Sequence, residues 1–281
     1  MLAIMGGTGI YGLEAIETRD EIHIETPFGT PSAPVVRGRW GGHDVLFLAR
    51  HGHGHRLLPH EINYRANILA LKHAGATQVI GISAVGSLAE KIAPGDLVLP
   101  EQYFDWTRGL RVASFFGDGI AAHVSTAQPV SANLARWLAD AASRQQIRCH
   151  RHVTYACVEG PRLGTRAESR FLQQAGCQVV GMTNVPEAFL AREAQLCYAS
   201  LGIVTDYDCW MEDPAQHVRA TEIFALYQQS LDRAIAVLAD CVEQPRPEAE
   251  AEIRSALSVA ILTPEAAWPP SSRDWMAVLR R

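Results

Sequence analysis

Residues 2–9 read LAIMGGTG, a short apolar run that passes directly into a glycine-rich turn. Such a run, ended by glycines, is typical of a buried strand followed by a tight turn. Similar apolar runs recur at 43–49, 78–83, 96–100, 153–158, 178–182 and 197–205. The repetition predicts a sheet of several buried strands.

Helical spacing of apolar residues fills many of the intervals between these strands. It predicts helices over 61–74, 131–146, 166–175, 186–195 and 219–243. Strands that alternate with helices are typical of α/β proteins with parallel strands. We therefore predict a single-domain α/β protein with a central mixed, largely parallel twisted β-sheet flanked by helices.

The composition of the chain changes only after Val242. The segment QPRPE at 244–248 has the character of a linker, and a short helical segment near 250–260 and a tail rich in proline and tryptophan follow it. We predict one domain over residues 1–243. Residues 244–281 are then a linker and a C-terminal tail that packs on its own or on a neighbouring subunit.

The overall composition excludes several classes of protein. The 281 residues are 48% hydrophobic, and the net charge of −5 argues against a surface for nucleic acid or anionic lipid. No stretch approaches the roughly 20 apolar residues of a membrane span, and the first residues lack the pattern of a secretory signal. The six cysteines form no CxxC pair, which argues against a zinc ribbon or a disulfide framework. We expect a cytoplasmic protein that binds neither nucleic acid nor membrane.

Glycines, hydroxyls and one arginine follow the predicted strands. GGTG at 6–9, Arg50-His51, SAVGS at 83–87 and GMTN at 181–184 each come at the end of an apolar run. Glycine turns let backbone N–H groups approach an anion, and the guanidinium fork of arginine suits phosphate oxygens. Ligands of open α/β sheets bind at the carboxyl ends of the strands. These segments therefore predict an anion site.

Two carboxylates, Asp206 and Asp208, follow the last predicted strand. A single aspartate here would indicate a turn or a helix cap. A pair of aspartates beside an anion site favours a role in acid/base catalysis or in hydrogen bonding to a ligand.

The histidines of RHGHGHRLLPH at 50–60 raise the alternative of a zinc site, because two histidines two residues apart at a strand end can bind zinc. A zinc-dependent hydrolase of that kind needs further ligands at later strand ends. The histidines at 73, 123, 150, 152 and 217 do not follow apolar runs. We therefore predict no metal, and the zinc hydrolase and a non-catalytic nucleoside- or phosphate-binding protein remain the less favoured alternatives.

Ten motifs in order carry a resemblance to a known family: GGTG at 6–9, TPFG at 26–29, LARHG at 48–52, NYRAN at 63–67, SAVGSL at 83–88, PGDLVLP at 94–100, EGPR at 159–162, RAES at 166–169, GMTNVPE at 181–187 and TDYDCW at 205–210. Together they resemble the trimeric purine nucleoside phosphorylase superfamily, with the 5′-methylthioadenosine phosphorylase branch as the closest match. The resemblance implies cleavage of an N-glycosidic bond by inorganic phosphate. It also implies no metal or organic cofactor, and a homotrimer with active sites at subunit interfaces.

The resemblance also implies roles for individual residues. The expected phosphate ligands are Thr8, Arg50, His51, Ser83, Ala84 and Thr183. The expected nucleoside ligands are Met182, Leu163, Gly164, Asp206, Asp208, Ile223 and His55, with His123 and Leu279 supplied by a neighbouring subunit. Asp206 is the expected proton donor to purine N7, and Asp208 the partner of the exocyclic amine.

The aspartate pair favours adenine, because an ionised carboxylate accepts from a 6-amino group and repels a 6-oxo group. For Asp206 to donate to N7 its pKa must be raised by burial and by Asp208. The implied substrate is 5′-methylthioadenosine, with a purine nucleoside or 5′-methylthioinosine as the alternative. Leu163-Gly164 and Asn184 depart from the usual residues of the branch and bear on base selectivity.

Overall fold

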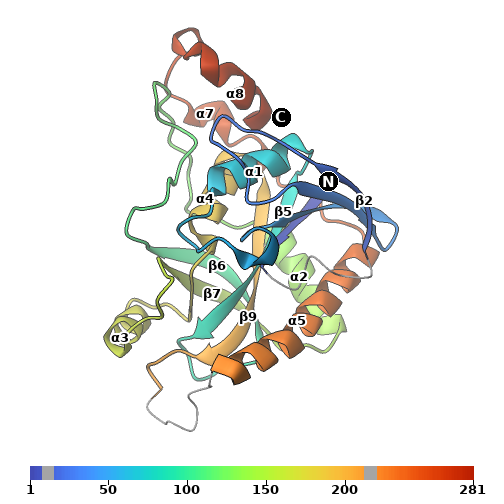
Figure 1. Ribbon diagram of the computed structural model, residues 1–281, viewed down its shortest axis with the longest axis vertical. Coiled ribbons are helices and arrows are strands. Elements are labelled where there is room, and N and C mark those ends of the chain that lie inside the picture. Colours follow the sequence, from blue (N-terminus) through green and yellow to red (C-terminus); the bar gives the residue numbers. More distant parts are fainter. Residues whose placement is uncertain (8–15, 212–219) are drawn as a thin grey trace.

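The computed structural model describes residues 1–7, 16–211 and 220–281, with backbone alone for Thr18 and for 220–227 (Figure 1). Two residues expected at the site are affected by these limits. Thr8 and the side chain of Ile223 lie outside the described part of the chain.

The strand that opens the chain, β1 (Leu2–Gly6), lies in the middle of the sheet and is buried along its whole length. It runs parallel to β4 (His43–Ala49) on one side and to β5 (Gln78–Ser87) on the other. Its side chains alternate between two apolar clusters, Ala3 and Met5 in one and Leu2 and Ile4 in the other. Burial on both faces explains why the strand is a continuous apolar run in sequence.

The sheet is mixed and closes on itself. Its order is β2-β3-β4-β1-β5-β8-β7-β6-β9, and β9 pairs again with β5, so that five strands form a closed ring. Five of the nine pairings between described strands are parallel, which confirms the predicted mixed, largely parallel sheet. The strands not yet given bounds are β2 (Ile16–Ile22), β3 (Val35–Trp40), β6 (Leu97–Trp106), β7 (Cys149–Val158), β8 (Val179–Gly181) and β9 (Cys197–Tyr207).

Helices cover the sheet in two groups, as Figure 1 shows. One group consists of α1 (Tyr64–His73), α4 (Asn184–Glu193) and α8 (Arg273–Leu279), and packs over the first cluster. The other consists of α2 (Ala132–Arg144) and α5 (Ala220–Glu243), which contact each other and β9. The remaining α-helices in the described part of the chain are α3 (Arg166–Gln174), α6 (Ala251–Arg254) and α7 (Leu257–Ala260).

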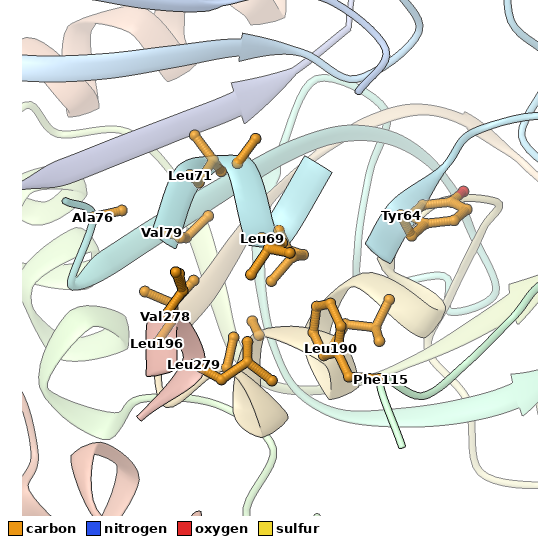
Figure 2. Packing of buried hydrophobic residues seen from close by; sticks show 14 of the residues in the cluster. Tyr64, Leu69, Leu71, Ala76, Val79, Phe115, Leu190, Leu196, Val278 and Leu279 are labelled. Carbon is orange, nitrogen blue, oxygen red and sulfur yellow. The ribbon is translucent and has the colours of Figure 1, made fainter. Parts of the chain in front are cut away.

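The C-terminal tail packs on its own subunit. Trp275, Met276, Val278 and Leu279 of α8 are buried in the first apolar cluster, and Figure 2 shows Leu279 among side chains of α1 and α4. The side chain of Leu279 has no exposed surface. The expectation that Leu279 reaches a neighbouring subunit's nucleoside is therefore wrong, because its side chain lies in the core of its own chain.

Two strands and one turn differ from the prediction. The segment SAVGS at 83–87 is not a turn but the second half of β5, because β5 keeps pairing with β9 beyond residue 83 across a bulge. β2 and β3 were not predicted, because IETRDEI and VVRGRW carry charges where a buried strand is apolar. β2 lies at the edge of the sheet, where charged side chains are common.

Two observations bear on the expected class of protein. No helix among the described residues is long and apolar enough to cross a bilayer. All six cysteines are free thiols, and four of them are buried.

Candidate active site

One cavity of about 840 Å³ opens at the carboxyl ends of β1, β4, β7, β8 and β9. Arg50 and Asp206, expected at opposite ends of the substrate, both line it. The expected residues that line the cavity are Arg50, His51, His55, Ser83, Ala84, Leu163, Gly164, Met182, Thr183, Asp206 and Asp208. The fold thus brings together segments that lie more than 150 positions apart in sequence. This agrees with the prediction that the residues after the strands meet at one edge of the sheet.

Two hydroxyl groups in the cavity wall make no hydrogen bond within the described part of the chain. These are Ser83 Oγ and Thr183 Oγ1, and both atoms are buried. Thr183 is the N-cap residue of α4, yet its hydroxyl caps no backbone N–H. A buried hydroxyl without a partner costs roughly 1–3 kcal/mol. Two such groups in one cavity wall, one in β5 and the other at the N-terminus of α4, therefore indicate a site for a ligand that accepts hydrogen bonds, and an anion fits best.

The guanidinium of Arg50 is buried, with only 1% of the residue exposed, and is mostly committed to the protein. Its Nε and Nη2 donate to the carboxylate of Glu187 at 2.6 and 2.8 Å, Nη2 also donates to Met5 O at 3.2 Å, and Nη1 donates to Ile82 O at 2.6 Å. Of the five N–H donors, one on Nη1 is left without a described partner. The two N–H groups of the guanidinium that were expected to bind phosphate therefore bind Glu187. Arg50 can offer an anion one N–H group and its positive charge.

Glu187 is a partner of Arg50 that the sequence argument did not identify. It is fully buried in α4 and also accepts a hydrogen bond from the Tyr198 hydroxyl at 2.8 Å. Apart from its place in the GMTNVPE motif, its sequence signal is an acid in the first turn of a helix, which usually indicates a dipole interaction. In the structure it fixes the plane of the Arg50 guanidinium.

His51 is held as a neutral ring. Its pKa is lowered to about 4, mainly by burial and also by the charges of Arg50 and His55, while the hydrogen bond to Leu57 acts in the opposite direction. Its Nδ1 lies 2.8 Å from Leu57 O, and its ring stacks on that of His55 with centroids 4.1 Å apart. His55 therefore reaches the cavity wall beside the anion end.

The histidines of residues 50–60 are the side chains for which zinc was considered. Within the described residues no group of three or more His, Cys, Asp or Glu side chains is arranged to hold a metal ion. His53 and His55 lie on a short 3-10 turn (His53–His55), and both are exposed.

The two aspartates project from the end of β9 on the same side, because side chains two apart on a strand share a face. A Cβ on Gly86 of β5 would lie 3.4 Å from Asp208 Cβ and 3.5 Å from Asp206 Oδ2, so both carboxyl groups stand over this glycine. Burial raises the pKa of Asp206 and the charge of Asp208 adds to this, while a 2.7 Å hydrogen bond from the Thr205 hydroxyl opposes it. This confirms the direction expected for an acid that donates a proton.

Asp208 is held differently from its neighbour. Its Oδ2 accepts a short hydrogen bond from the Ser169 hydroxyl, and its backbone N–H donates to Ser87 O at 3.0 Å. Ser169 belongs to α3, whose N-terminus is fixed by a capping box between Thr165 and Glu168. The RAES motif therefore positions the second aspartate.

A second buried cation, Arg111, joins the two sides of the cavity and had no sequence signal, because it lies in an irregular segment. Its Nε donates to Glu159 Oε1 at 2.8 Å, and its Nη1 donates to Met182 O and Val185 O at 2.7 Å each. It thus ties the turn after β8, which carries Thr183, to the turn after β7.

The remaining expected residues lie at the middle and at the mouth of the cavity. Met182 packs against Gly160, whose φ is +67° and whose position has no room for a Cβ, since that atom would lie 2.5 Å from Met182 Sδ. Leu163 is 75% exposed and lines the mouth with Gly164. His123 is exposed and does not line the cavity, so a role toward a neighbouring subunit stays a prediction.

The chain is similar to known proteins over nearly its whole length. A family model described as the phosphorylase superfamily matches residues 1–244. The chain is 46% identical over 285 residues to the S-methyl-5′-thioadenosine phosphorylase of Bradyrhizobium diazoefficiens, with 100% of this chain and 97% of the relative covered. It is 43% identical over 274 residues to the enzyme of that name from Geobacter sulfurreducens, with 98% and 96% covered.

Solved structures give the same result. A methylthioadenosine phosphorylase from an antarctic soil metagenomic library matches with a TM-score of 0.91 at 43% identity, covering 99% of this chain and 98% of that one. The methylthioadenosine phosphorylase of Schistosoma mansoni in complex with adenine matches with a TM-score of 0.80 at 34% identity, covering 86% and 90%.

Proposed function

The chain belongs to the phosphorylase superfamily, and from this we propose that it cleaves 5′-methylthioadenosine with inorganic phosphate. The products are adenine and 5-methylthioribose 1-phosphate. The observation that carries the proposal is the cavity itself, which holds unpartnered hydroxyls beside a buried cation at one end and an acid with a raised pKa at the other.

The phosphate end acts through orientation and charge. Ser83 Oγ, Thr183 Oγ1 and the remaining Arg50 N–H are donors for the oxygens of one dianion. The bound dianion stands beside the sugar carbon at which positive charge grows as the glycosidic bond breaks. Fixed donors that need no reorganisation during the reaction are the main source of such electrostatic stabilisation.

The base end supplies a proton to the leaving group. The electron pair of the breaking C1′–N9 bond passes to the purine, and Asp206 gives its proton to N7. The hydrogenphosphate dianion forms the new C1′–O bond and loses its own proton, so that the net reaction transfers one proton from phosphate to adenine. General acid catalysis of this kind contributes typically 10²–10⁴-fold.

Asp208 distinguishes adenine from hypoxanthine in this proposal. As a carboxylate held by Ser169, it accepts a hydrogen bond from the 6-amino group and repels a 6-oxo group. We expect Asp208→Asn to shift the ratio of kcat/KM for adenine over hypoxanthine nucleosides toward hypoxanthine by about 10–100-fold, because an amide can donate to the 6-oxo group and one such contact is worth about 1–3 kcal/mol. A ratio equal to that of the wild type would remove Asp208 from base selection.

The direct test is substrate profiling with and without phosphate. We expect 5′-methylthioadenosine to be cleaved only when phosphate is present, with adenine and a sugar 1-phosphate formed in equal amounts. A strong preference for inosine or 5′-methylthioinosine would favour the alternative substrates. Phosphate-independent release of adenine would contradict the proposal.

We further propose that the enzyme is a cytoplasmic homotrimer that uses phosphate as co-substrate and has no resident metal or organic cofactor. A neighbouring subunit would place its exposed His123 at the mouth of the cavity. Light scattering would then give about three times the chain mass of 30.7 kDa. A fully active monomer would contradict this.

A further inference from the structure

The orientation of His51 fixes which of its ring nitrogens carries a proton. Nδ1 lies 2.8 Å from the backbone carbonyl oxygen of Leu57. A carbonyl oxygen has lone pairs and no hydrogen, so Nδ1 must be the donor of this bond. In a neutral imidazole Nε2 then bears a lone pair and accepts hydrogen bonds.

The Nε2 side of the His51 ring lies beside another residue of the cavity wall. His51 lines the cavity wall, and a Cβ on Gly7, another wall residue, would lie 3.9 Å from His51 Cδ2, the carbon bonded to Nε2. Nε2 has no hydrogen-bond partner in the described part of the chain. Nε2 is therefore the ring nitrogen that remains available to a ligand in the cavity.

The surroundings of His51 disfavour a second proton on the ring. The described charged or titratable neighbours that act on it are the Arg50 guanidinium and the stacked His55 ring, and both add to the effect of burial in lowering its pKa to about 4. His51 is thus an acceptor in a cavity wall that also carries donors, because Ser83, Thr183 and Arg50 line the same cavity.

We propose that His51 Nε2 accepts a hydrogen bond from the P–OH group of the hydrogenphosphate dianion, so that the site selects dianions that carry one acidic hydroxyl over dianions that carry none. This inference rests on the proposed function and names the protonation state of its co-substrate. The same contact gives the phosphate proton an acceptor while the new C1′–O bond forms.

The selection follows from the arrangement of hydrogens around the anion. Hydrogenphosphate and hydrogenarsenate present a hydroxyl to Nε2 and bind without any change in the protonation of His51. Sulfate has no hydrogen at neutral pH, so it would place an oxygen against the Nε2 lone pair. Sulfate therefore binds only when His51 takes up a proton from solution.

Calorimetric titration tests this with phosphate, arsenate and sulfate as probes, in the presence of adenine and in buffers of different ionisation enthalpy. We expect sulfate to bind with uptake of about one proton, and its Kd to rise about tenfold per pH unit between pH 6 and 8. The Kd values of phosphate and arsenate, expressed for the singly protonated dianions, should stay within about twofold over this range and involve no proton uptake.

Two glutamine variants separate this role from general effects of histidine removal. In His51→Gln the amide can donate to sulfate, so the pH dependence of sulfate binding should disappear. His53→Gln, an exposed residue on the neighbouring 3-10 turn, should behave as the wild type. Sulfate binding without proton uptake in the wild type, or an unchanged pH dependence in His51→Gln, would overturn the inference.

The two proposals fail in different ways. Because binding is measured and not turnover, the titrations report on His51 whether or not the protein is a phosphorylase. Absence of phosphate-dependent cleavage would defeat the proposed function alone, and pH-independent sulfate binding would defeat the role of His51 alone.

Discussion

Asp206→Asn should lower kcat/KM for 5′-methylthioadenosine by about 10²–10⁴-fold, the usual contribution of a general acid. The asparagine amide can keep a hydrogen bond to N7 but cannot transfer a proton. The loss should therefore appear mainly in kcat, measured in steady-state assays with saturating phosphate. Full turnover by the variant would show that Asp206 is not the acid.

The pH dependence of the rate is a second test of the role of Asp206. The pKa of Asp206 is raised, and the acid works when protonated. The wild-type rate should thus fall as the pH rises through this raised pKa, and the variant should lack that step. Asp140→Asn on the exposed face of α2 is the matched control and should keep the wild-type profile.

Stability distinguishes lost chemistry from damage to the fold. A raised carboxyl pKa stabilises the folded protein at low pH, and this contribution is lost as the pH rises through the folded-state value. At neutral pH the asparagine variant escapes the cost of a buried carboxylate, so its Tm should equal or exceed that of the wild type. A strongly lowered Tm would assign the activity loss to misfolding.

Glu187→Gln should lower the free energy of unfolding by about 3–5 kcal/mol, because the buried charge of Arg50 loses its compensating carboxylate. Glu187 is fully buried and holds the guanidinium with two hydrogen bonds. The phosphate KM should rise as well, since Arg50 is no longer fixed. Denaturant unfolding and phosphate titration of the initial rate measure the two effects.

A double variant separates the stability of this pair from its role in binding. Replacement of Arg50 by Met together with Glu187 by Leu removes both charges, which is often neutral or stabilising for a buried pair. The double variant should recover stability but not phosphate affinity. Recovery of both properties would show that Arg50 has no part in binding the anion.

Much of the fold could be predicted because its strands are buried on both faces. β1, β4 and β9 are nearly continuous apolar runs, and glycine or polar residues follow each of them directly. The carboxyl ends of such strands meet at one edge of a sheet, so the meeting of Arg50 with Asp206 followed from the pattern. The charged edge strand β2 and the closure of β9 onto β5 depend on pairing across the sheet, which apolar runs do not encode.

The sequence predicted which residues line the site, but not which residues their side chains bond to. Arg50, Ser83, Thr183 and Asp206 line one cavity as expected. The sequence could not indicate that Glu187 would occupy the Arg50 fork, because the two lie 137 positions apart. Arg111 was missed for a similar reason. Most of its hydrogen bonds are to backbone carbonyl groups, which every residue has and which therefore leave no pattern in the sequence.

The central claim is that one cavity holds phosphate at the Arg50 end and purine at the Asp206 end. A crystal structure of the protein with adenine and phosphate tests it most directly. We expect phosphate within hydrogen-bond distance of Ser83 Oγ, Thr183 Oγ1 and Arg50 Nη1, and adenine N7 facing the Asp206 carboxyl group. Phosphate bound outside this cavity, or a purine whose N7 faces away from Asp206, would contradict the account.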